Sequence, residues 1–342
     1  MPRFSIIIVS WNALHHLKTF LPGVAETDYN DFEIILADNA STDGSKQWVR
    51  KQYPGIKIVT FDKNYGYCGG NNRAVSYANG DILLFLNNDV KVDPDWLSPL
   101  GIMFDENKNM AVAQPKMRSY KNPEAFEYAG AAGGYIDRYG YPFCRGRIFD
   151  TVELDEGQYD DAAHIFWASG AAFAVRKKVF QQLGGFDEDF QFHMEEIDLC
   201  WRIWNHGHEI AYCPQSVVYH LGGGSLAMES PRKLYYNYRN SLMMLWKNYT
   251  ASMLLLRFPV RLMLDKIAAL RELLTGNFNA FKAIAKAHWH FWRSLSKTAQ
   301  KRTEIKKEPT RQGHEMPMVS YSIIWQYFLK GIKYFRDLPH EC

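Results

Sequence analysis

Acidic, amide and hydroxyl side chains recur wherever a short apolar run of this 342-residue sequence ends. The polar groups that follow four successive runs are Ser10-Trp11-Asn12, residues 38–45, residues 62–66 and Asn87-Asn88-Asp89. Such groups gathered in one place would suit a polar ligand that has many hydroxyls and a charged group. Any one of these turns is explained by ordinary turn chemistry, but four in succession favour a binding site.

Asp89 stands at the end of an apolar run, beside Asn87 and Asn88. A carboxylate at that place, with amide oxygens next to it, suits a hard divalent cation. Asp89 could equally cap the turn before a helix that begins near Asp93. His220 ends the run SVVYH and offers an imidazole, a good ligand for Mn²⁺, although a lone histidine is more often a surface residue.

Three carboxylates, those of Glu195, Glu196 and Asp198, lie close together at the expected start of a helix. Asp198 precedes Arg202 by one helical turn, so we expect an ion pair and a structural role for Asp198. Either glutamate could act as a general base whose pKa is tuned by its neighbours in a closed site. The helix macrodipole alone would also explain two acidic residues at a helix start.

These side chains need a scaffold that brings strand ends together. Apolar runs at residues 4–9, 33–38, 56–61 and 82–86 alternate with helical patterns at residues 12–21, 43–53 and 69–78. Strands separated by short helices predict a parallel sheet with right-handed crossovers. Because such sheets bind ligands at the carboxyl ends of their strands, we expect the polar groups to gather there.

The middle of the chain is less periodic. Residues 110–165 are rich in Gly and Tyr and predict loops and short hairpins, which often form a wall of a site. The elements expected after them are a strand at 169–175, helices at 176–183 and 195–207, strands at 209–212 and 216–220, and a flexible exit at Gly222-Gly223-Gly224.

The composition, with 47% apolar and 23% charged residues, is that of a globular protein and excludes disordered and disulfide-scaffold classes. Five scattered cysteines without a C-x-x-C pair indicate reduced thiols of an intracellular protein. The first apolar run is too short for a signal peptide, and no stretch reaches the ~18 apolar residues of a spanning helix.

Charge divides the chain at about residue 230. Residues 1–229 hold 20 Lys and Arg against 30 Asp and Glu, whereas residues 230–342 hold 20 against 7. The basic segment carries Lys282, Lys286, Arg293, Lys297 and Lys301 at helical spacing, interleaved with Trp289 and Trp292. This profile is typical of a helix on an anionic membrane surface, although packed helices with a solvated basic face would share it. Nucleic-acid binding is not expected, because the front half is acidic and no binding motif is present.

Taken in order, the motifs resemble family 2 glycosyltransferases over residues 5–225. The matching strings are VSWN, ADNASTDGS, N-x-G-x-x-G-G-N-N at residues 64–72, LLFLNNDV, ASGAAFAVRKKVFQQLGGFDEDF, EEIDLCWR and VVYH-L-GGGS. The later strings are similar to those of bacterial rhamnosyltransferase-like and galactofuranosyltransferase-like members. The resemblance implies a GT-A fold, which is an α/β fold with a mostly parallel, Rossmann-like sheet flanked by helices. It also implies a nucleoside-diphosphate sugar donor such as dTDP-rhamnose or a UDP-sugar, a divalent cation (Mn²⁺ or Mg²⁺) and, normally, inversion at the anomeric carbon.

The resemblance also assigns roles to residues. The nucleotide-sugar-binding positions it implies are Ser10, Asn12, Asp38, Asn64, Gly66, Gly69, Asn72, Asn87 and Asn88, with Trp11 beside them to pack against the base. Asp89 matches the last Asp of the family's D-x-D motif, and His220 matches a histidine that some members add to the metal. Glu196 matches the catalytic base.

This sequence departs from the family pattern at two of these positions. Asn87 replaces the first Asp of D-x-D, which removes one negative charge. Metal binding should therefore depend more on the diphosphate and on His220. The base is a Glu rather than an Asp, and Glu195 beside it leaves the assignment open between the two, of which we favour Glu196. Asp187 and Arg239 could bind the acceptor, although Asp187 would also serve as a turn residue.

We therefore expect a catalytic domain over residues 1–229, with a nucleotide-sugar-binding half (1–110) and an acceptor-binding half (111–229). A basic, mainly helical extension follows over residues 230–342. The expected acceptor is a glycan or lipid-linked glycan of a bacterial surface polysaccharide, and the expected location is cytoplasmic, at the inner face of the cytoplasmic membrane. This sequence lacks the glycine-rich loop after the first strand that a nucleotidyltransferase or a dinucleotide dehydrogenase would require, so neither class is expected. A non-catalytic scaffold that binds nucleotide sugars remains the alternative, supported by Asn87.

Overall fold

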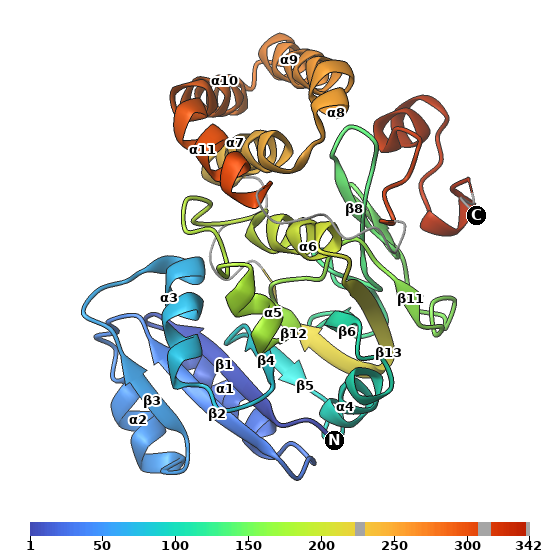
Figure 1. Ribbon diagram of the computed structural model, residues 1–342. Coiled ribbons are helices and arrows are strands. Elements are labelled where there is room, and N and C mark those ends of the chain that lie inside the picture. Colours follow the sequence, from blue (N-terminus) through green and yellow to red (C-terminus); the bar gives the residue numbers. More distant parts are fainter. Residues whose placement is uncertain (223–229, 307–315, 340–342) are drawn as a thin grey trace.

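The computed structural model describes residues 1–222, 230–306 and 316–339, so Gly223 and Gly224 of the expected flexible exit lie outside the described residues. A curled sheet flanked by helices forms the body of the molecule (Figure 1). Its strands run in the order β11-β13-β6-β12-β4-β1-β2-β3, and β5 pairs with β13. Their bounds are β1 (Phe4–Ser10), β2 (Phe32–Asp38), β3 (Lys57–Thr60), β4 (Ile82–Leu86), β5 (Val90–Val92), β6 (Met110–Ser119), β11 (Ala163–His164), β12 (Ala172–Arg176) and β13 (Glu209–His220).

The first four predicted strands form the parallel half of this sheet, as expected. β1 lies between β2 and β4 and pairs in parallel with both, and β3 extends the sheet beyond β2. The continuous apolar run of β1 is buried on both faces, with Phe4, Ile6 and Ile7 fully inaccessible. Burial on both faces is what favours β-branched side chains at every position of such a strand.

The other half of the sheet is mixed, which the sequence reasoning did not predict. β12 pairs antiparallel with β4 and β6, whereas β13 pairs in parallel with β6 and antiparallel with β5 and β11. The two strands expected at residues 209–212 and 216–220 are one strand, β13, with an irregularity between Cys213 and Val217. A bulge of this kind lets one strand keep pairing past an unpaired stretch.

Helices cover both faces of the sheet (Figure 1). Those of the first two hundred residues are α1 (Leu14–Ala25), α2 (Ser45–Gln52), α3 (Gly66–Ala74), the short turn η1 (Val75–Tyr77), α4 (Leu97–Glu106), α5 (Lys177–Gln182) and α6 (Glu195–Asn205). α1 continues through Pro22 instead of ending there, since Leu17, Leu21 and Val24 bury one continuous face. α3 begins three residues earlier than expected, directly at Gly66, whose φ is +70°.

A small antiparallel sheet occupies part of the segment predicted as loops and hairpins. Its strands are β7 (Gly134–Ile136), β8 (Pro142–Cys144), β9 (Arg147–Ile148) and β10 (Thr151–Val152). It packs against the end of the chain, which contains the turns η2 (Trp325–Leu329) and η3 (Phe335–Asp337). The prediction missed the long strand β6 at the start of this segment.

The basic segment is helical, as expected. Its helices are α7 (Pro231–Asn248), α8 (Ala251–Leu256), α9 (Phe258–Leu274), α10 (Phe278–Arg293) and α11 (Leu295–Ile305). α7 lies against α6, and the buried Leu242 and Leu245 of α7 belong to the same apolar cluster as Leu199 and Ile203 of α6 (Figure 1). The basic segment therefore shares its core with the rest of the chain. Within the described ranges, no helix is both long and apolar enough to cross a membrane.

Candidate active site

Ser10 and Asp38 lie side by side at the carboxyl ends of β1 and β2, where the parallel register pairs them. Asp38 is fully buried, and its carboxylate accepts a hydrogen bond from the Ser41 amide and lies 3.4 Å from Lys46 Nζ. The Ser10 hydroxyl is buried and has no partner among the described residues. Because an unpaired buried hydroxyl is costly, this one is well placed to bond a ligand. The sequence did not show that Ser41, within the predicted polar turn, and Lys46 hold Asp38 in place.

The turns after β1 and β2 are tied to each other by Asn12. This residue has a φ of 49°; its amide donates to Ser41 Oγ at 2.9 Å, and its Oδ1 accepts from the Thr42 amide at 2.8 Å. Trp11 is 55% exposed, so its indole is free to cover a flat ring. Asn12 thus holds the turn after β1 in place, while Trp11 offers an exposed aromatic surface on which a flat ring could stack.

The turn before α3 is held by its own side chains. Asn64 Oδ1 accepts from the Gly66 amide at 2.8 Å, which fixes the left-handed Gly66. Gly69 is a point of close approach, because a Cβ there would lie 3.3 Å from Glu188 Oε2 on the loop before α6. These two glycines therefore allow α3 to approach that loop.

Two neighbouring asparagines of α3 differ in their surroundings. Asn72 is bound on both sides, because its Nδ2 donates to the Phe186 carbonyl at 2.8 Å and its Oδ1 accepts from the Phe186 amide at 3.0 Å. Asn71 is 1% exposed, and neither polar atom of its amide has a partner among the described residues. Asn72 thus holds α3 to the loop before α6, and Asn71, which the sequence reasoning missed, is the amide left free for a ligand.

Asp89 and His220 meet because the pairing of β5 with β13 puts His220 opposite Val90. Asp89 Oδ1 lies 3.3 Å from His220 Nε2, and Glu127 Oε1 lies 3.2 Å from His220 Nδ1. Burial alone would raise the pKa of Asp89, but the hydrogen bond and charge of His220 lower it below the usual value. Burial alone would lower the pKa of His220, but Asp89 and Glu127 raise it to about 10.

Asp89 would offer Mn²⁺ a carboxylate oxygen, and His220 would offer an imidazole nitrogen once the cation displaces its Nε2 proton. Glu127, which the sequence reasoning missed, is positioned to orient the imidazole through Nδ1. The described part of the chain contains no group of three or more His, Cys, Asp or Glu arranged to hold a metal. A cation here would therefore take two protein ligands, with Asn87 and Asn88 half-buried beside them and phosphate or water completing the shell.

Glu195 and Glu196 begin α6, after a loop with unusual backbone angles. Gln191, His193 and Met194 all have positive φ values, between 62° and 73°. Asn240 of α7 is fully buried, and its Nδ2 lies 2.6–2.9 Å from the carbonyl oxygens of residues 190, 192 and 193. Strained angles of this kind persist only where the surroundings impose them, and here α7 does so.

Glu195 and Glu196 differ from an ordinary surface acid in their hydrogen bonding and in their pKa values. Each has a buried Oε2 without a hydrogen-bond partner among the described residues. Burial, with the charge of Glu196 added, raises the pKa of Glu195 well above its usual value, and burial raises the pKa of Glu196 to about 7. Burial and then these two carboxylates also raise the pKa of Tyr67, so the starts of α3 and α6 face each other. A carboxylate with a pKa near 7 can accept a proton from a hydroxyl at neutral pH.

Asp198, by contrast, is fully paired. Its carboxylate accepts from Arg202 Nε at 3.0 Å, which confirms the expected ion pair, and from Lys247 Nζ at 2.9 Å and Asn248 Nδ2 at 2.8 Å. Because Lys247 and Asn248 belong to α7, the basic segment neutralises a buried acid of the helix that carries Glu196. Asp198 is therefore a structural residue.

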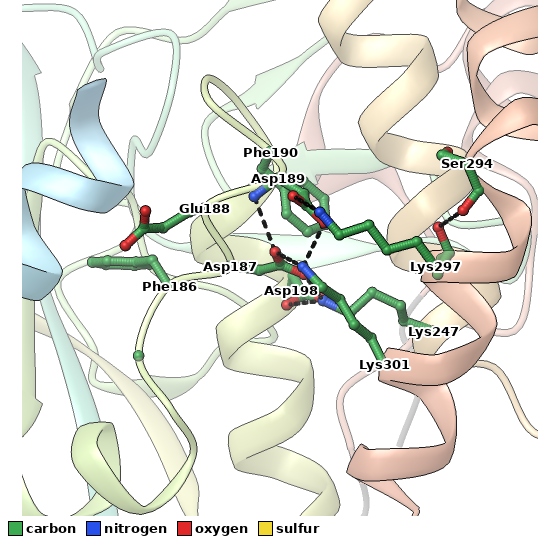
Figure 2. Close-up of polar contacts among 12 residues, drawn as sticks. Phe186, Asp187, Glu188, Asp189, Phe190, Asp198, Lys247, Ser294, Lys297 and Lys301 are labelled. Carbon is green, nitrogen blue, oxygen red and sulfur yellow. Dashed lines mark hydrogen bonds and ion pairs between the residues drawn. The ribbon is translucent and has the colours of Figure 1, made fainter. Parts of the chain in front are cut away.

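Asp187 and Arg239 were predicted to bind the acceptor. Asp187 lies in the loop before α6, and Arg239 of α7 contacts that loop. Asp187 is paired with Lys247 Nζ at 2.6 Å and with Lys301 (Figure 2). Arg239 donates to the carbonyl oxygen of Asp189 at 2.6 Å. These contacts hold the loop before α6 onto α7 and α11.

Lys297 and Lys301, two lysines of the predicted basic stripe, pair with acids of the loop before α6. Lys297 Nζ lies 2.6 Å from Asp189 Oδ1, and Lys301 contacts both Asp187 and Asp189 (Figure 2). Helical spacing alone could not show that these two lysines of the predicted stripe face acids of the preceding loop.

Comparison with known proteins shows the family of the chain. Residues 5–184 match the model of glycosyl transferase family 2. The chain is 31% identical over 234 residues to the O-antigen biosynthesis protein RfbC of Myxococcus xanthus, covering 64% of this chain and only 17% of that protein. It is 24% identical over 281 residues to an N-acetylglucosaminyl-diphospho-decaprenol L-rhamnosyltransferase of Mycobacterium tuberculosis, covering 78% of this chain and 91% of that protein.

The fold is also similar to that of solved glycosyltransferases. The mannosyltransferase PcManGT from Pyrobaculum calidifontis, in complex with GDP-Man and Mn²⁺, aligns with a TM-score of 0.53 and 15% identity, over 89% of this chain and 85% of that one. The family model covers more than half of the sequence. The chain therefore belongs to glycosyl transferase family 2 and is a glycosyltransferase.

Proposed function

We propose that this glycosyltransferase moves a sugar from a nucleoside-diphosphate sugar to a hydroxyl of a lipid-linked glycan in bacterial surface polysaccharide synthesis. The observation that carries the proposal is the half-buried Glu196 at the start of α6, whose buried Oε2 has no hydrogen-bond partner among the described residues and whose pKa is raised to about 7. The mycobacterial relative, an N-acetylglucosaminyl-diphospho-decaprenol L-rhamnosyltransferase, supports dTDP-rhamnose as the donor and a lipid-linked acceptor. A UDP-sugar is the second choice of donor.

In the proposed reaction Glu196 takes the proton of the acceptor hydroxyl as its oxygen attacks the anomeric carbon. The bond between that carbon and the diphosphate oxygen breaks on the opposite face, so the sugar is transferred with inversion. Ser10 and Asp38 bind the nucleoside, and Trp11 covers the base. Asp89 and His220 would hold the divalent cation, Mn²⁺ or Mg²⁺, which offsets the charge of the leaving diphosphate when bound. We favour Glu196 over Glu195 because the pKa of Glu196 lies closer to neutral.

We also propose that the enzyme works at an anionic membrane surface, at the inner face of the cytoplasmic membrane. On α9, the apolar side chains of Met263, Ile267, Leu270 and Leu274 are each more than half exposed along one face, which also bears Lys266 and Arg271. Asp265, on the same helix, is fully buried and accepts from Arg261 at 2.8 Å. A face that combines exposed apolar and cationic side chains suits the boundary of an anionic bilayer. Packed helices with a solvated basic face are the alternative.

A non-catalytic scaffold that binds nucleotide sugars is a second candidate function. It is favoured by Asn87, which stands where the family's D-x-D motif has its first Asp. Such a scaffold would bind donor without turnover, and replacing Glu196 would leave its behaviour unchanged.

A melting-temperature screen of nucleotide sugars, with and without Mn²⁺, tests the donor and the cation together. A donor at about a hundred times its Kd should stabilise the fold by about 2.7 kcal/mol. We expect this stabilisation to require Mn²⁺ and to be lost in Asp89→Asn. The matched control is Asp81→Asn, which removes an exposed carboxylate next to the opposite end of β4. Stabilisation that persists without Mn²⁺ and in Asp89→Asn would contradict the proposed cation site.

A further inference from the structure

A pocket of about 430 Å³ opens between the start of α7 and α10, outside the site described above. Three cations, two tyrosines and an amide line it: Arg232, Lys282, Lys286, Tyr235, Tyr236 and Asn279. None of the described residues that line this pocket is acidic. Neither the proposed donor site nor the proposed base uses these residues.

No described acidic residue neutralises the three cations of the pocket. Within the described ranges, none of them has an acidic partner at ion-pair distance, whereas Lys247, deeper in α7, is paired with two aspartates. Arg232 instead lies over the ring of Tyr236, and Lys286 Nζ lies 5.7 Å from the ring centre of Tyr235. Burial and then three nearby cations, the first of which is Lys286, lower the pKa of His290, as expected where the local field is positive. As far as the described residues go, the pocket therefore concentrates positive charge that no acid pairs with.

One wall of the pocket is attached to the loop that leads to the proposed base. Tyr236 Oη donates to Gln191 Oε1 at 2.7 Å, and the Arg232 guanidinium lies 5.9 Å from the ring centre of Phe192. Glu195 and Glu196 follow this loop directly along the chain. A ligand bound in the pocket would thus lie against the segment that positions Glu196.

We infer that this pocket binds the phosphate or diphosphate group through which the acceptor glycan is joined to its lipid. The inference rests on the proposed function, because it assumes a lipid-linked acceptor. An anion with several charges would balance Arg232, Lys282 and Lys286, and guanidinium and ammonium groups are strong donors to phosphate oxygens. The positive end of the α7 macrodipole adds to the attraction.

The position of α10 agrees with a lipid leaving the pocket. The helix that supplies Lys282 and Lys286 also exposes Trp289 and Trp292, each by about half. Tryptophan side chains are typical of the level of the headgroups in a bilayer. The pocket would therefore hold the phosphate while the lipid runs along α10 to the membrane.

Binding of a short-chain prenyl diphosphate, compared with the matching prenyl alcohol, tests the inference on the full chain. Divalent cations are omitted so that the donor site does not compete. We expect the wild-type protein to bind the diphosphate at least about tenfold more tightly than the alcohol, since charge-assisted hydrogen bonds are lost with the phosphates. Arg232→Gln with Lys286→Gln should abolish this difference. Lys266→Gln with Arg271→Gln, which removes the same charge from the exposed face of α9, should preserve it.

Two further measurements separate the sources of phosphate. Arg232→Gln with Lys286→Gln should raise the KM for a diphosphate-linked acceptor about tenfold or more and leave the KM for the donor unchanged. These variants should bind acceptor-free anionic vesicles as the wild type does. A preference for the diphosphate that survives in the variants, a raised donor KM, or a loss of vesicle binding would each overturn the assignment. If no acceptor is glycosylated, the proposed function fails, while the binding comparison still decides what the pocket holds.

Discussion

Replacing Lys247 by Met tests whether the basic helices are an integral part of the catalytic fold. Lys247 is 2% exposed, and its Nζ lies 2.6 Å from Asp187 Oδ2 and 2.9 Å from Asp198 Oδ2. Met keeps most of the volume but leaves two buried carboxylates short of one cation. Removing one partner of a buried ion pair costs about 3–5 kcal/mol. Because Lys301 still serves Asp187 and Arg202 still serves Asp198, we expect the lower end, about 3 kcal/mol.

The assay is the melting temperature of the two proteins at neutral and at acid pH. A loss of about 3 kcal/mol corresponds to a decrease of about 6 °C. This uses about 2 °C per kcal/mol, the smallest shift for domains of about 150–250 residues. Burial would raise the pKa of Asp187, but Lys247 and then Lys301 lower it overall, so the ionised form is favoured in the folded state. Its stabilisation is therefore present above the unfolded pKa of about 3.9 and is lost as the pH falls further. The difference between wild type and variant should accordingly shrink below about pH 4.

The control is Lys266→Met, which removes an exposed cation of α9 and should leave the melting temperature within about 1 °C of the wild type. If Lys247→Met costs no more than this control, or if its effect is equally large at pH 3, then the ion pairs between α7 and the loop before α6 do not stabilise the fold as argued.

Three further predictions concern activity and binding. The kcat/KM of the wild type should rise about tenfold per pH unit below pH 7 and level off above it, as Glu196 loses its proton; a flat profile would exclude it as the titrating base. Asn240→Ala should lower kcat more than it raises the KM for the donor, because three loop carbonyls lose their donor; equal effects on both constants would argue against a positioning role. Ile267→Glu with Leu270→Glu should abolish binding to anionic vesicles without changing turnover of a soluble acceptor. Ile102→Glu, on the exposed side of α4, should leave vesicle binding intact, and loss in both would indicate a non-specific charge effect.

The parallel half of the sheet could be predicted because the sequence patterns that indicate it are local. The buried run of β1 and the turn residues that follow it identify a parallel strand and its polar end without any knowledge of distant partners. The meeting of Ser10 and Asp38 then follows from the parallel register of adjacent strands. The composition of Phe4–Ser10 and of Phe32–Asp38 is enough to predict these two strands and their polar ends.

The rest depended on contacts between residues far apart in the sequence. His220 reaches Asp89 only because β13 passes an irregularity and then pairs with β5, and no local pattern shows that register. Glu127 comes from an irregular segment, so its place beside His220 carried no signal at all. The positive charge of the basic segment could be predicted from its composition. The sequence did not show that Lys247 and Lys301 pair with Asp187.

The most direct test of the central claim, that Glu196 is the base for sugar transfer, is the turnover number of Glu196→Gln with donor, acceptor and Mn²⁺ at saturation. The account predicts a decrease of about 10²- to 10⁴-fold, with the donor raising the melting temperature as much as it does in the wild type. A variant that keeps turnover within tenfold of the wild type would contradict it.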